Sequence, residues 1–192
     1  MDANLNDANL SDALLSDVSL SEANLTDADL ARAYLNDANL SGALLRGANL
    51  NGTNLSGAVF SGADLTNATL VGADLTDAIL AVTNLTGADL TRANLDHANL
   101  TIANLTDANL TDANLTGSDR SYANLSGAIL SDTDLEECVM IKANLERATL
   151  VGCNIFGIST WGVRTAGAIQ RDLILTGTFE PMNLQLGLTT ST

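Results

Sequence analysis

The amino-acid sequence predicts an all-β solenoid, a tube of stacked coils with leucine and alanine inside and polar side chains outside. Three observations predict it. Leucine occupies every fifth position from 5 to 155 in 27 of 31 cases, and Ala stands two positions before it in 24 of 31 cases. Between the two lies Asn or Asp in 21 of 31 cases. Repetition at a fixed short period, without insertion or deletion, indicates a repeat architecture.

The five-residue period excludes both a simple helix and a flat sheet. In an α-helix, five residues advance about 500°, so the leucines would be spread around the helix instead of forming a stripe. A flat sheet alternates with an even period. A short extended piece followed by a corner fits, because Ala and Leu, two residues apart, then point to the same side. The next two residues, often Ser or Thr and then Asp or Gly, supply the turn.

Units such as Ala103-Asn104-Leu105-Thr106-Asp107 bury their apolar side only by coiling, with the backbone bonded to the coils above and below. The repeat, written A(N/D)LXX, resembles that of the pentapeptide-repeat family, in its leucine-rich cyanobacterial form, continuously over residues 1–155. The resemblance implies a right-handed quadrilateral β-helix with about 20 residues per coil and roughly eight coils.

The chain is predicted to depart from the strict repeat after its long regular part. We expect residues 1–155 to form an uninterrupted β-helix, 156–180 an irregular terminal coil and C-terminal cap, and 181–192 a partly disordered tail. Phe156 and Trp161 are expected at the small inward position of a shifted repeat, where they would close the tube. An open solenoid end exposes apolar surface and unpaired backbone, which a cap removes.

The amino end carries acids on every side of the predicted tube. The acids at the outward turn position are Asp2, Asp7, Asp12, Asp17, Glu22 and Asp27. Acidic edges repel one another, so charge is one way in which this end would be protected. End-to-end contact with another molecule, including a homodimer through an end of the solenoid, and continuation in a longer protein are the alternatives.

The bulk charge restricts the partners. A formal net charge of −15 and a pI near 4.1 argue against direct binding to nucleic acid or an anionic membrane, because Lys and Arg bind phosphates. They permit a basic protein partner, or mimicry of nucleic acid toward a protein that binds it. No apolar run approaches the roughly 20 residues of a membrane span, and no signal peptide is visible at the start. A cytoplasmic location is therefore expected.

Residues with catalytic chemistry are few and scattered. The single histidine, His97, falls at an outward turn position and is expected on the surface, without a second ligand at metal-binding spacing. Cys138 and Cys153 replace the inward Ala and are expected as buried reduced thiols. No glycine-rich phosphate loop with a lysine occurs, and the carboxylates are regular rather than paired. The sequence predicts a non-enzymatic protein without cofactor or metal.

Departures from the repeat mark a candidate interaction stripe. With about 20 residues per coil, as the resemblance implies, Val82, Ile102 and Tyr122 stack in one outward column that ends at Lys142. Hydrophobic residues also occupy neighbouring outward positions on the same face. The candidate interaction stripe comprises Val59, Ile79, Val82, Ile102, Tyr122, Val139 and Ile141. An exposed apolar patch marks a partner or dimer surface; neutral drift on a tolerant surface is the alternative.

Arg120 occupies an inward leucine position on that same face. An unpaired buried guanidinium is very costly. We therefore expect the chain to distort locally so that Arg120 escapes, meeting Asp119 or the C-terminal carboxylates. Such a break in regularity is either a recognition feature or a tolerated defect.

Two functions follow. The first is a non-catalytic structural or protein-interaction solenoid of otherwise unassigned molecular function, with an unidentified protein partner. The second is an acidic DNA mimic that binds DNA gyrase or another nucleic-acid-binding protein, which resemblance to the quinolone-resistance members of the family implies. Those members commonly have Phe at the central inward position and dimerise through a C-terminal module, and some carry projecting loops. This chain has Leu there and no loop over residues 1–155, which favours the first function.

Overall fold

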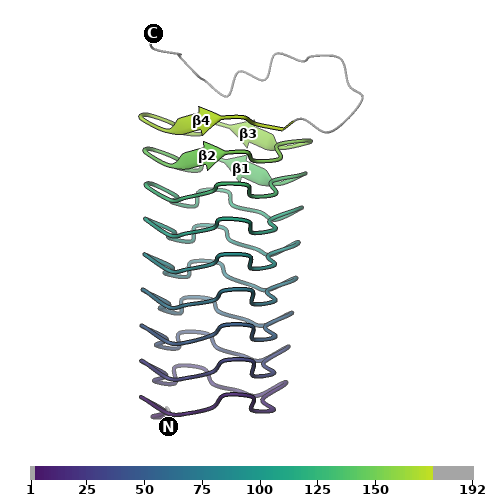
Figure 1. Ribbon diagram of the computed structural model, residues 1–192. Coiled ribbons are helices and arrows are strands. Elements are labelled where there is room, and N and C mark those ends of the chain that lie inside the picture. Colours follow the sequence, from purple (N-terminus) through teal and green to yellow (C-terminus); the bar gives the residue numbers. More distant parts are fainter. Residues whose placement is uncertain (1–2, 175–192) are drawn as a thin grey trace.

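The computed structural model describes residues 3–174, which wind into a stack of similar coils (Figure 1). Each coil has four short extended sides joined by four two-residue corners. Parallel β-bridges join each side to the same side of the next coil along the whole described chain, from Asn4 with Asn24 to Asn154 with Ile174. The fold is therefore the predicted right-handed quadrilateral β-helix, in which one coil spans the interval from Asn4 to Asn24.

Most sides are too short to be strands, and the longer ones lie near the carboxyl end of the described chain. The strands are β1 (Val139–Ile141), β2 (Thr149–Val151), β3 (Ser159–Trp161) and β4 (Ile169–Arg171). β1 pairs with β3 and β2 with β4, both parallel. Between residues 3 and 174 there is no apolar helix of membrane-spanning length.

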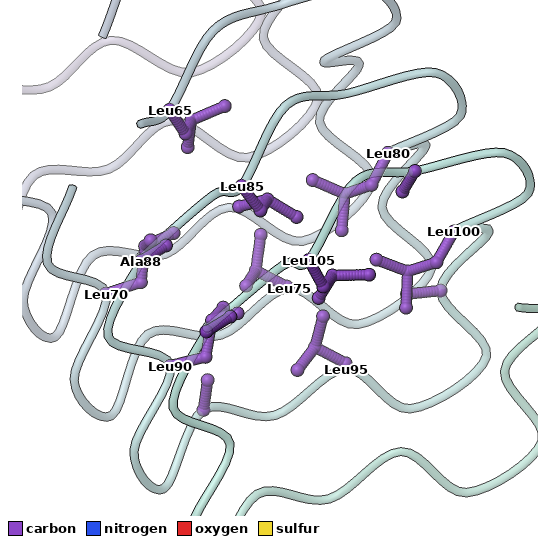
Figure 2. Packing of buried hydrophobic residues seen from close by; sticks show 14 of the residues in the cluster. Leu65, Leu70, Leu75, Leu80, Leu85, Ala88, Leu90, Leu95, Leu100 and Leu105 are labelled. Atoms are coloured by element: carbon purple, nitrogen blue, oxygen red, sulfur yellow. The ribbon is translucent and has the colours of Figure 1, made fainter. Parts of the chain in front are cut away.

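The interior of the tube is a continuous stack of leucine and alanine layers (Figure 2). Leucines such as Leu105 are completely enclosed, whereas Leu10 in the first coil is only partly buried, because a neighbouring coil covers it on one side. Each enclosed leucine contributes roughly 1.5–3 kcal/mol. The predicted inside and outside of the five-residue unit are both confirmed.

The backbone of each unit is bonded to the coils on both sides. The Leu105 N–H donates to the carbonyl oxygen of Asn124 in the next coil at 2.7 Å, and the Asn104 N–H donates to Thr83 in the previous coil at 2.9 Å. At the corner, the Asp107 N–H donates to Ser126 at 3.0 Å. The backbone hydrogen bonds thus run along the axis of the tube, and its sides present side chains.

The corners explain the choice of polar residues. The second corner residue has a positive φ, as in Asp107 with 57° and Gly127 with 71°. Gly, Asn and Asp adopt this left-handed conformation most readily. The side-chain oxygen of Asn104 accepts the Thr106 N–H at 3.2 Å and the Thr106 hydroxyl at 2.6 Å, which fixes the corner from the preceding side.

The shift of the repeat expected after residue 155 is wrong for residues 156–174. β1 and β3 keep the register of the earlier coils, with Ile141 opposite Trp161. A shift by one residue would turn every side chain to the opposite face, and the bonds to the preceding coil prevent it. Phe156 is consequently half-buried at a corner, and Trp161 lies outside the tube with 66% of its surface exposed.

In this register the inward positions of residues 156–174 are Ile158, Thr160, Val163, Thr165, Ala168, Gln170 and Leu173. The cap predicted within 156–180 lies partly outside the described residues, and the tail predicted at 181–192 lies wholly outside them. The three-segment division of the chain stays a prediction.

Candidate interaction surface

One corner of the tube carries an exposed apolar column. Val82, Ile102 and Tyr122 are the second corner residues of three successive coils and expose 60%, 59% and 55% of their surfaces. Their backbones are held like those of other corners, since the Ile102 N–H donates to the Ser121 carbonyl at 3.0 Å. The column is therefore a regular part of the tube with unusual side chains.

The same column is conformationally strained. Val82 has a φ of 63° and Ile102 a φ of 61°, and among residues 3–174 they are the only β-branched residues with positive φ. For a β-branched residue this conformation is a genuine outlier, with a cost of order 1–3 kcal/mol each. Elsewhere Gly, Asp or Asn holds most such positions. Exposure and strain thus coincide at two neighbouring coils.

The rest of the predicted stripe lies on the side that ends at this corner. Val59 and Ile79 face each other across a parallel bridge, and Ile79 is 40% exposed. On the same side of the next two coils, Asn99 and Asp119 separate this pair from Val139. Val139 and Ile141, both half-buried, belong to β1. The structure therefore places all seven residues on one side and its corner, with the pairs Val59–Ile79 and Val139–Ile141 beside the exposed column.

The sequence places Lys142 at the end of this column, but sequence reasoning did not place Trp161 on this surface. Lys142 continues the exposed column, and its Nζ lies 5.4 Å from the centre of the Tyr122 ring and 5.1 Å from that of Trp161. A lysine over aromatic faces is attracted by the ring electrons. Counting one further coil from Ile141 would have found Trp161, had the register been continued past 155. We call the seven predicted residues together with Lys142 and Trp161 the extended stripe.

Acids lie on both sides of the extended stripe. Asp77 and Glu137 are exposed in the neighbouring corner column, whereas Asp107 and Arg147 are both exposed in the corner column on the other side. Asp119 lies half-buried within the face itself. The side of the apolar column that carries Asp77 and Glu137 therefore favours positive charge on a partner.

Arg120 does not escape from the tube, so the expected local distortion is wrong. Its side chain is completely buried, and Nε, Nη1 and Nη2 have no hydrogen-bond partner among the described residues. Its backbone keeps the regular pattern, donating to Val139 at 2.8 Å and accepting from Ala123 at 3.0 Å. Burial lowers the pKa of the Arg120 guanidinium. The coil-to-coil bonds hold the residue inward in spite of its charge.

The two thiols are buried and reduced, as expected. The Cys138 Sγ donates to the Leu135 carbonyl oxygen at 2.9 Å, and the Cys153 Sγ donates to Leu130 at 2.6 Å. Burial raises the pKa of Cys138, and it raises the pKa of Cys153 to about 11. Both thiols therefore act as small core residues.

The single histidine lies on the outer surface. His97 is exposed at a corner with a φ of 55°, and its Nε2 is 3.9 Å from Asp96 Oδ1. Within residues 3–174, no three His, Cys, Asp or Glu side chains are grouped as metal ligands.

Comparison with known proteins places this geometry in context. A family model described as Pentapeptide repeats matches residues 3–42, 43–80, 83–119 and 121–155, with eight copies. No curated protein matches the chain.

Among solved structures, HetL, a pentapeptide repeat protein involved in heterocyst differentiation regulation from the cyanobacterium Nostoc sp. strain PCC 7120, is 29% identical. The match covers 91% of this chain and 90% of HetL, with a TM-score of 0.47. AT2G44920, from the thylakoid lumen of Arabidopsis thaliana, is 34% identical over 51% of this chain and 68% of its own, with a TM-score of 0.50. QnrB1, a plasmid-mediated fluoroquinolone resistance protein, is 19% identical over 80% of this chain and 87% of its own, with a TM-score of 0.37.

Proposed function

Because the chain belongs to the pentapeptide-repeat family, we propose that it is a non-catalytic solenoid that binds a partner protein through the extended stripe. The observation that carries the proposal is the coincidence of strain and exposure at Val82 and Ile102. Neither burial nor corner geometry favours a β-branched residue there. Strained residues cluster where function requires them, and a contact with another molecule supplies the missing benefit.

The aromatic end of the extended stripe supports the same function. Tyr122 and Trp161 expose 55% and 66% of their surfaces, and Tyr and Trp are enriched among the residues that dominate binding energy at interfaces. Lys142 lies over both rings and restrains them, so that little side-chain freedom remains to be lost on binding.

The experiment is a capture of partners from extracts of the cells that make the protein. Wild type is compared with Ile102→Asp and with the matched control Ile129→Asp, whose isoleucine is 43% exposed outside the extended stripe. We expect one set of proteins to be lost with Ile102→Asp and retained with Ile129→Asp. Identical proteins on all three would refute the proposal.

The charge of the tube favours a second candidate, an acidic DNA mimic that binds DNA gyrase or another nucleic-acid-binding protein. Residues 3–174 contain 21 acids and 8 bases over a length of about 41 Å, at about 4.8 Å per coil. This is about one net negative charge per 3 Å, against one per about 1.7 Å in duplex DNA. The lower density makes the mimic the second candidate. A gyrase supercoiling assay without inhibition at micromolar protein would exclude gyrase as its target.

Location and assembly complete the proposal. We propose a cytoplasmic protein, which cell fractionation tests. A homodimer through an end of the solenoid is the form of self-association that we propose for the chain. Sedimentation velocity tests it, and a single monomeric species would contradict it.

A further inference from the structure

We infer that the partner element bound by the extended stripe is an amphipathic α-helix with basic residues beside its apolar face, lying along the axis of the tube. The inference rests on the proposed function and specifies the chemistry of its partner. It follows from the hydrogen bonding of the corner, the spacing of the coils and the charges around the column.

Hydrogen bonding excludes the addition of a strand to this surface. Strand addition needs free backbone N–H and C=O groups at the edge of a sheet. Here the Val82 N–H donates to Thr101 at 3.0 Å, and the Tyr122 N–H donates to Ile141 at 2.7 Å. The corner N–H groups are thus committed to the neighbouring coils, so no free donors are left for an added strand, and a partner contacts the side chains.

The spacing of those side chains matches a helix. Paired coils are about 4.8 Å apart, so Val82 and Tyr122 are about 9.6 Å apart along the axis, with Ile102 between them. Helical residues i and i+7 are about 10.5 Å apart, with i+3 or i+4 between them. Same-face residues of a strand are about 6.7 Å apart, which does not match the spacing between neighbouring coils. A polyproline helix repeats about every 9.3 Å, which leaves Ile102 uncovered.

The aromatic end extends the match by one turn. Lys142 lies one coil beyond Tyr122, about 14 Å from Val82 along the axis, and holds the rings of Tyr122 and Trp161. A helical residue at i+10 lies about 15 Å from residue i. A fourth apolar residue of the same helix face therefore reaches the two rings.

The charges decide what lies beside the apolar face of that helix. Asp77 and Glu137 are exposed on one side of the column, whereas the corner column on the other side carries both Asp107 and Arg147 exposed. Lysine or arginine at the edge of the helix that faces Asp77 and Glu137 would be attracted to them. A second copy of this chain is disfavoured as the occupant, because each copy has a net charge of −15 and like charges repel.

Designed peptides test the inference with the full-length chain, using fluorescence anisotropy. The probe is a helical peptide of about 18 residues with leucines spaced i, i+3, i+7 and i+10 and lysines beside them. Three controls have comparable length and charge: one spreads the leucines around the helix, one alternates Leu and Lys, and one is proline-rich. We expect the probe to bind at least tenfold more tightly than each control.

The variants Ile102→Asp and Ile129→Asp assign the binding site. Asp is a natural corner residue at positive φ, as Asp107 shows, so Ile102→Asp is expected to fold; circular dichroism checks this. We expect Ile102→Asp to weaken probe binding at least tenfold and Ile129→Asp to leave it unchanged.

The remaining outcomes separate the inference from the function on which it rests. Equal binding of the spread-leucine control, or of the alternating or proline-rich control, overturns the helix. Absence of any peptide binding also overturns it, while the proposed function stands if Ile102→Asp loses partners in the capture experiment. A dimer of the wild type that Ile102→Asp dissociates makes a second copy the occupant and overturns the helical partner.

Discussion

Arg120 donates its backbone N–H to the carbonyl oxygen of Val139 at 2.8 Å, the bond that inward leucines make with the next coil, although its guanidinium is enclosed and unpaired. The ladder between coils therefore prevails over the cost of burying one cation. An unpaired charge in an apolar interior is among the largest single costs in a fold, and it makes Arg120 a site at which substitution gains stability.

Replacing Arg120 with leucine is expected to raise the free energy of unfolding by about 1–4 kcal/mol, the gain seen when hydrophobic residues replace buried ion pairs. Urea titration measures the change. Arg46→Leu is the control, because Arg46 makes an exposed ion pair with Asp64 at 2.6 Å and such pairs contribute about 1 kcal/mol or less. A loss of stability in Arg120→Leu would show that the guanidinium is satisfied in solution.

The strained column predicts a conflict between stability and binding. Val82→Asn is expected to raise the free energy of unfolding by about 1 kcal/mol, since Asn accepts a positive φ and a β-branched residue does not. The same variant is expected to weaken partner binding. Asp77→Asn, at a corner whose φ is 57°, is the control and should change stability little. Stability that is unchanged or lower in Val82→Asn would remove the argument from strain.

The interior predicts a gradient along the tube. Leu105→Ala is expected to lower the free energy of unfolding by about 2–5 kcal/mol, because the cavity lies between two coils. Leu10→Ala in the first coil, where the leucine is already partly exposed, should cost clearly less. Thermal and urea unfolding compare the two variants, and equal losses would contradict the packing described for the first coil.

The Cys153 thiol predicts a fall in stability at alkaline pH. Burial raises its pKa from 9.0 to about 11, so between these values the native state holds a proton that the unfolded state has released. The stabilisation is complete below pH 9 and is lost as the pH rises through about 11. Cys153→Ala introduces the residue usual at this position and should flatten that part of the curve. A pH profile of unfolding with the same slope in both proteins would contradict the prediction.

The contact of Lys142 with the aromatic rings has a direct spectroscopic readout, because Trp161 is the single tryptophan. Lys142→Ala is expected to leave the indole freer and more open to water, with stronger acrylamide quenching of its fluorescence. Lys142→Arg keeps a cation over the ring and should resemble the wild type. Quenching that is the same in all three proteins would show that the rings are not held by the cation.

Much of the fold follows from counting, which explains why the sequence predicts it. A five-residue side and four sides per coil place Val82, Ile102 and Tyr122 in one column, and the bridges confirm that register. The alternation of inward Ala and Leu with outward Asn or Asp likewise determines which residues are enclosed. These predictions needed no knowledge of individual contacts.

The two errors have one physical cause. Arg120 was expected to leave the tube and Trp161 to enter it, because each side chain was judged by its own preference for water. In the structure the backbone ladder sets the register for all residues alike, and Trp161 stays outside because Ile141 does. The signal for Trp161 was the count of whole coils that places Lys142, continued one coil beyond Ile141 and past the last regular repeat.

The five-residue side also makes the direction in which an outward residue points depend on the number of units that precede it. Removing one whole coil from the amino end would bring the column one coil nearer to that end and leave its residues aligned. Inserting a single five-residue unit between Ile102 and Tyr122 would rotate everything beyond it by a quarter-turn, so that the aliphatic and aromatic halves of the column would point in directions a right angle apart. Between positions 82 and 142, inserting or deleting a whole coil therefore keeps the residues of the column aligned, whereas inserting or deleting part of a coil does not.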